Sequence, residues 1–177
     1  MTEAIPGHLR DIELADGSRV HVRPLRPDDE PLLHDAFARM SERSVYFRFF
    51  SPLKRLSDDL AHKLAAVDGN DRYALCATTH RISPERREQI AGVARYDRVP
   101  GTEVAEVAIA VVDDFQRQGL GSQLLAMLAA VARDHGIRVF TLIVLPENQS
   151  MLRLLRRMGW IHQAKLRGGM YEISFEL

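Results

Sequence analysis

Residues 107–124 read VAIAVVDDFQRQGLGSQL, which is an apolar run, a turn with two glycines, and a second apolar run. The first run predicts a strand, and the second, with leucines four residues apart, predicts a helix. The first amides of a helix have no partner within it and lie at the positive end of its dipole, so this junction favours an anion. Gly119 and Gly121 let the backbone approach that anion, and Arg117 adds a cation.

Three phosphate-binding patterns compete for this turn. The P-loop requires a lysine after its last glycine, and none follows either glycine here; the dinucleotide fingerprint requires a third glycine, which is also missing. The pattern Q-x-x-G-x-G, filled by Gln116, Gly119 and Gly121, resembles the pyrophosphate loop of the GNAT N-acetyltransferase superfamily. The simpler alternative is a helix start that needs glycines only to turn.

A second segment supports the resemblance. Residues 145–160, LPENQSMLRLLRRMGW, are similar to the later motif of the same superfamily and follow the first motif at the expected place, one helix and one strand later. The resemblance implies that Asn148 contacts the cofactor arm, whereas its alternative role is that of a helix N-cap. Many members carry a tyrosine seven residues after this asparagine, and here that position is Leu155.

Two upstream segments extend the similarity. Residues 22–29, VRPLRPDD, are like the opening strand and helix entry of many members, and residues 44–50, SVYFRFF, look like a segment of bacterial protein-lysine acetyltransferases that act on acetyl-CoA synthetase. The resemblance covers roughly residues 20–177 and fits the catalytic domain of those enzymes.

The resemblance implies an α/β (α+β) fold with a mixed, mostly antiparallel central sheet, helices on both faces, and a splay at the cofactor strand. It implies acetyl transfer from acetyl-CoA to a primary amine by direct attack, and the amine is expected to be a protein lysine. The backbone of three strand residues would pair with the pantetheine arm, and the turn would bind the pyrophosphate through its amides. The strand residues are Ala110, Val111 and Val112; the turn residues are Gln116, Arg117, Gln118, Gly119, Leu120, Gly121 and Ser122.

Glu106 is the expected catalytic base, because its strand resembles the glutamate-bearing strand of the lysine acetylases. A carboxylate within an otherwise apolar strand has a raised pKa, which a base acting near neutral pH requires. The alternative is an exposed carboxylate at a strand end, and Glu103 is the reserve candidate. Since Leu155 has no proton to donate, the thiolate would leave unassisted or be protonated by water, Tyr171 or Tyr46.

The chain reads as a loose lead-in over residues 1–11 and a single domain over residues 12–177. The hydrophobic pattern predicts a hairpin, helices, a meander of strands, and a final hairpin. The apolar run at 139–145 predicts a strand covered on both faces. The expected strands are 12–14, 20–23, 73–79, 90–96, 104–112, 139–145, 161–167 and 170–175; the expected helices start at residues 28, 57, 120 and 148.

Composition narrows the function classes further. The 177 residues carry 24 basic and 24 acidic side chains, so there is no basic excess to suggest nucleic acid. A single cysteine, Cys76, is expected in the core, and the seven histidines show no ligand spacing, so no metal is expected. With no apolar start and no apolar run of membrane-spanning length, a cytoplasmic monomer or homodimer is the expectation.

Three functions remain open at this level. A protein-lysine acetyltransferase, a small-molecule amine acetyltransferase and a non-catalytic acyl-CoA-binding module share the cofactor motif and differ in the acceptor loops. Four cations, namely Arg43, Arg48, Lys54 and Arg55, are candidates to line an acceptor site or are ordinary surface charges. Arg153 is a candidate to approach the nucleotide phosphate of the cofactor.

Overall fold

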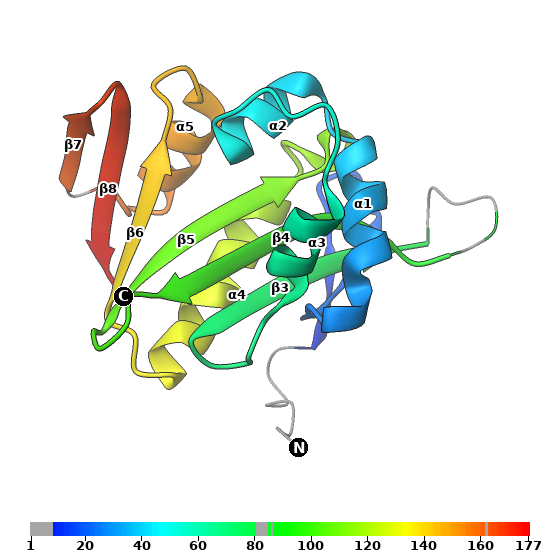
Figure 1. Cartoon of the computed structure of the whole chain (residues 1–177), viewed down its shortest axis with the longest axis horizontal. Coiled ribbons are helices and arrows are strands. Elements are labelled where there is room, and N and C mark those ends of the chain that lie inside the picture. The colour runs from blue at the N-terminus through cyan, green and yellow to red at the C-terminus, as the bar shows by residue number, and fades with distance from the viewer. Residues whose placement is uncertain (1–8, 81–84, 86, 162) are drawn as a thin grey trace.

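A computed structural model describes residues 9–80, 85, 87–161 and 163–177 (Figure 1). A single eight-stranded sheet runs through the described residues, with the order β1-β2-β3-β4-β5-β6-β8-β7. Every neighbouring pair is antiparallel except β5 and β6, which are parallel. The strands are β1 (Arg10–Glu13), β2 (Arg19–Pro24), β3 (Arg72–Thr79), β4 (Gln89–Arg98), β5 (Val104–Val111), β6 (Val139–Val144), β7 (Gln163–Arg167) and β8 (Met170–Glu176).

Helices cover both faces of the sheet, as expected. In Figure 1, α1 and α3 lie in front of the sheet and α4 lies behind it. The buried side of α4 consists of leucines, alanines, a methionine and a valine at helical spacing, so this helix packs its apolar face on the central strands. The helices are α1 (Glu30–Ala38), α2 (Glu42–Phe49), α3 (Asp58–Ala65), α4 (Leu120–Asp134) and α5 (Gln149–Arg157), with two short 3-10 turns, η2 (Pro27–Asp29) and η3 (Asp113–Phe115).

The N-terminal elements differ from the prediction in three details. β1 begins at Arg10, inside the segment expected to be a lead-in, because backbone pairing with β2 does not depend on side-chain polarity. The N-cap of α1 is Asp29 and not Asp28, because η2 precedes the helix. Helix α2 was not predicted, although Ser41 caps it by accepting a hydrogen bond from the Ser44 amide.

The expectation that β6 is covered on both faces is wrong. Its side chains alternate between buried and less buried, and Ile143 is 48% exposed. The cause is the arrangement of the neighbouring elements: α5 packs behind β6, while the opposite face of the strand lines a cleft. The charged loop expected at residues 82–88 lies largely outside the described residues.

No helix within the described ranges is long and apolar enough to cross a membrane. Cys76 is fully buried in the core, and burial raises the pKa of its thiol to about 12. The cysteine therefore fills space in the core, as expected, and is not a reactive thiol.

Candidate active site

The site begins where the two parallel strands part. β5 pairs with β6 over only three residues, Val104 to Glu106, opposite Val139 to Thr141. β5 continues for five more residues alongside β4, so its other edge has no strand partner there. Unpaired backbone donors and acceptors at such an edge are available to a ligand that lies alongside as an extra strand.

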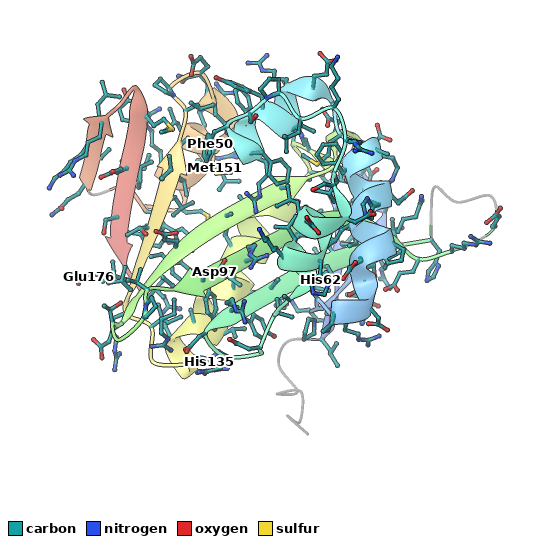
Figure 2. The ribbon with its side chains drawn as sticks, viewed as in Figure 1. Phe50, His62, Asp97, His135, Met151 and Glu176 are labelled. Atoms are coloured by element: carbon teal, nitrogen blue, oxygen red, sulfur yellow. The ribbon has the colours of Figure 1, made fainter. Side chains whose placement is uncertain are left out.

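A large cleft opens at this fork, with a volume of about 2130 Å³. It is lined by β5 and β6, by the start of α4, and by α2 and α5. Phe50 follows α2 and Met151 belongs to α5, and both line the cleft; Figure 2 shows them at the end of the molecule where these two helices lie. A cleft of this size is large enough for an extended ligand with two distinct ends.

The glycine turn forms one end of the cleft. Arg117 and Gly119 both have left-handed backbone conformations, with φ of 58° and 84°, and α4 starts immediately afterwards. The first turn of α4 carries no acidic residue, so nothing opposes the positive end of the helix. The geometry is that of an anion-binding helix start.

Nine of the twelve residues expected from the sequence line the cleft together: Glu106, Ala110, Val111, Gln116, Arg117, Gly119, Gly121, Ser122 and Asn148. Val112, Gln118 and Leu120 do not. The Val112 amide donates to the Ala91 carbonyl, and its own carbonyl accepts from Phe115, so its backbone is already engaged. Leu120 is a core side chain of α4.

Gln118 has a different role in this structure. Its side-chain oxygen accepts a hydrogen bond from the Asp16 amide, and its carbonyl accepts one from Ala15. Gln118 therefore joins the glycine turn to the turn between β1 and β2. The sequence pattern contains no signal for this contact, because about a hundred residues separate the partners.

A hydrogen-bond network joins the turn to the start of α2. Asp113 accepts from the Ser41 amide at 2.9 Å and from the hydroxyls of Ser41 and Ser44 at 2.7 and 3.1 Å. The side-chain nitrogen of Gln116 donates to the Ser44 hydroxyl and to the Val111 carbonyl, both at 3.0 Å. Sequence reasoning missed this set; Ser41 as a helix cap was the only local sign of it.

Asn148 lies where both of its expected roles are possible, at the start of α5 and at the edge of the cleft. Its side-chain oxygen accepts a hydrogen bond from the Met151 amide at 3.2 Å and so caps α5. The same residue lines the cleft. The N-cap role is therefore observed. A contact between its side-chain nitrogen and the cofactor stays a prediction.

Glu106 lies at the fork itself, opposite Asp97 of β4 and Thr141 of β6. Its side chain is exposed, so the burial expected for this carboxylate is not observed. The reason is that only one face of β5 is covered at this point, and Glu106 points to the open face. Glu103 is also exposed but lies before the strand and outside the cleft lining.

Neither of the tyrosines considered as a proton donor in place of Leu155 lies in the described lining. Leu155 is fully buried in the core, and neither Tyr46 nor Tyr171 lines the cleft. Among the cleft residues that the structure describes, there is no tyrosine, histidine or cysteine. In the same described ranges, no three His, Cys, Asp or Glu side chains form a group able to hold a metal ion.

The sequence of this chain is similar to those of known acetyltransferases. The sequence profile of the Acetyltransferase (GNAT) family matches residues 42–160. The chain is 31% identical over 150 residues to "Acetyltransferase PA5475" of Pseudomonas aeruginosa, covering 85% of this chain and 79% of that protein. It is 28% identical over 155 residues to "Acetyltransferase Pat" of Mycolicibacterium smegmatis, covering 86% of this chain and 45% of that protein.

A solved structure matches almost the whole chain. The GNAT domain of S. lividans PAT superposes with a TM-score of 0.88 and 34% sequence identity, over 99% of this chain and 100% of that domain. The likeness thus extends across the sheet, the fork and the helices around it. By sequence and by structure, this chain belongs to the GNAT family and is an acetyl-CoA-dependent N-acetyltransferase.

Proposed function

We propose that this chain acetylates the side-chain amine of a lysine in a protein, with Glu106 as the general base. The observation that carries the proposal is the position of Glu106 at the last paired residue of β5, where the open edge of the strand begins. Two relatives support the protein acceptor: one is named Pat and the other is the GNAT domain of S. lividans PAT.

The cofactor would lie along the open edge of β5. In this arrangement the backbone of Ala110 and Val111 holds the pantetheine arm, and the amides from Arg117 to Ser122 hold the pyrophosphate. Val112 supports the strand from behind, since its backbone groups are engaged elsewhere. The thioester would then lie further down the strand, towards Glu106.

The reaction requires a neutral amine. A free lysine has a pKa of about 10.4, so it is almost fully protonated at pH 7. Glu106 would accept this proton directly or through one water, and the amine nitrogen would attack the thioester carbonyl. The N–C bond forms and the C–S bond breaks; the nitrogen loses its second proton to water, and the CoA thiolate takes a proton from water, because the described lining offers no tyrosine, histidine or cysteine.

Thiol release from acetyl-CoA tests this assignment. We expect turnover on a purified acetyl-CoA synthetase, and a loss of kcat/KM by about 10²- to 10⁴-fold in Glu106→Gln. Acetyl-CoA affinity in the variant, measured by calorimetry, should stay unchanged because the carboxylate does not contact the phosphates.

Glu103→Gln is the matched control, because it makes the same change three residues earlier and outside the cleft. Equal losses in the two variants would remove Glu106 as the base. Turnover on small amines but not on the protein would keep the enzyme class and replace the acceptor. Bound acetyl-CoA with no turnover on either acceptor would instead favour a binding module.

A further inference from the structure

The half of the cleft around Glu106 is surrounded by cations from five different elements. Some of them are neutralised by carboxylates. The paired ones are Arg95 with Asp97 at 3.0 Å, Arg167 with Glu172 at 3.5 Å, and Arg72 with Asp68 at 3.6 Å. These pairs leave the local charge unchanged.

Away from the glycine turn, the first turn of α2 and α5, three further lining cations have no carboxylate within ion-pair distance among the described residues: Arg48, Lys63 and Lys165. Two lining carboxylates are likewise without a cation there, Glu106 and Asp113. Asp113 is saturated by the hydrogen bonds at the start of α2. The region beside Glu106 therefore carries a positive excess, although the formal charge of the chain is zero.

Arg48 is the least exposed of the three. Its guanidinium stacks at 4.9 Å over the Phe49 ring and lines both the main cleft and a small apolar cavity under α2. Burial, followed by the nearby positive charge of Arg95, lowers the pKa of Arg48 to about 10. A partly buried cation next to another cation is stabilised when an anion binds nearby.

These cations are separate from those beside the expected cofactor phosphates. Arg117 lies on the glycine turn, and Arg153, Arg156 and Arg157 lie on α5. By contrast, Arg95 and Asp97 share the face of the sheet on which Glu106 lies, and Lys63 belongs to α3 in front of that face (Figures 1 and 2). The two groups of cations thus serve different ends of the cleft.

From this arrangement we propose that the acceptor end of the cleft binds an acidic surface, so that the protein acetylated carries Asp or Glu side chains around its target lysine. The proposal deepens the proposed function and rests on it. A lone lysine would be repelled from a positive cleft, whereas neighbouring carboxylates would bring it in.

Matched peptides test the charge preference. Three peptides share one central lysine and differ only in whether the flanking residues are Glu, Gln or Arg. We expect the Glu peptide to have a KM about tenfold lower than the Gln peptide with a similar kcat, and the Arg peptide to be worst. The advantage of the Glu peptide should shrink as salt rises from about 50 to 500 mM.

Charge variants of the cleft assign the effect to residues. The exposed pair Lys63 and Lys165 can be changed together to Gln, which leaves the half-buried Arg48 in place. This double variant should lose most of the preference for the Glu peptide while acetyl-CoA affinity and kcat stay unchanged. Arg133→Gln together with Arg138→Gln is the control, because both arginines are exposed and lie outside the cleft lining.

The outcomes separate this inference from the function beneath it. Turnover with equal KM for the three peptides would overturn the inference and leave the protein acetyltransferase in place. Turnover of a free amino acid well above that of the Glu peptide would overturn it too, since the cations would then serve a small carboxylate. Turnover of small neutral amines alone would overturn both. A KM that rises for the Glu peptide only in the cleft variants would support it.

Discussion

Gly119 and Gly121 are two residues apart, yet different physical demands place a glycine at each position. Gly119 has φ of 84°, a conformation that other residues rarely adopt, and a Cβ there would meet only the Gln123 side chain at 4.0 Å. Gly121 has an ordinary helical conformation, but a Cβ there would lie 3.1 Å from a methyl group of Leu154. The first glycine shapes the turn, and the second lets α4 and α5 come together beside the cleft.

At the residue scale, we expect Gly121→Asp to weaken acetyl-CoA binding by about a hundredfold, because it adds a negative charge to the helix start that would hold the pyrophosphate. Calorimetric titration measures the affinity, and thermal unfolding checks that the variant is folded. Gly121→Ala adds the Cβ without the charge and should bind nearly normally, since the flexible end of Leu154 can move. Normal affinity in a folded Gly121→Asp protein would refute phosphate binding at this turn.

Among the elements, α2 links the two sides of the site. It lines the cleft opposite α5, and its first turn is held by Asp113, which follows the cofactor strand. The side chain of Gln116, on the glycine turn, donates to Ser44, which also bonds to Asp113. The acceptor side and the cofactor side of the cleft are therefore joined through one set of side chains. Movement of the glycine turn would shift α2 through these hydrogen bonds.

We expect Asp113→Ala to loosen α2, because three hydrogen bonds to a charged acceptor are lost at once. Amide hydrogen exchange over residues 42–49 should speed up by about tenfold or more, while β3 stays protected. The KM for the protein acceptor should rise more than the acetyl-CoA dissociation constant.

Asp114→Ala is the matched control, since Asp114 is the exposed neighbour outside the cleft lining. If hydrogen exchange in α2 is the same in both variants, the network does not hold the helix. If exchange rises but acceptor KM does not, the helix has no part in acceptor binding.

For the whole molecule, one buried ion cluster ties distant parts of the chain together. Arg23 of β2 donates to both oxygens of Asp29 at 2.8 and 2.9 Å and to Glu88 before β4. Burial alone would raise the pKa of Asp29, but hydrogen bonds from Arg23 and from the Arg26 amide outweigh it and hold that pKa below its usual value. The Arg23 guanidinium likewise holds the pKa of Glu88 low.

These directions set the sign of the pH dependence. Because both pKa values are lower in the folded chain than in the unfolded one, the cluster stabilises the fold above about pH 4 and loses its effect as pH falls further. We expect Asp29→Asn to lower the free energy of unfolding by about 3 kcal/mol at pH 7, and by much less at pH 3. Urea unfolding at the two pH values measures the difference.

Glu13→Gln serves as the control, since its ion pair with Arg19 is 3.9 Å long and both side chains are mostly exposed. It should change the free energy of unfolding little at either pH. A loss in Asp29→Asn that is the same at pH 7 and pH 3 would show that packing, and not the charge, is what Asp29 contributes.

The sequence by itself determined the elements that have strong local signals. The strand, turn and helix over residues 107–124 are as predicted, because the change from a strand-like to a helical hydrophobic period depends only on residues close together in the sequence. The final hairpin around Gly168 and Gly169 and the helix stop at Gly136 follow from backbone preferences in the same way. The short helix α2 was not predicted, because polar and apolar residues are equally frequent in its eight residues and the contacts that hold it are tertiary.

Only the tertiary structure decided which residues meet. The parting of β5 and β6 after Glu106, the exposure of that carboxylate, the contact of Gln118 with Asp16 and the anchoring of α2 by Asp113 all join segments far apart in the chain. Cations from α2, α3 and β7 surround one cleft for the same reason. Periodicity and capping depend on residues within a few positions of each other, whereas strand order, burial and electric field depend on what the folded chain brings alongside.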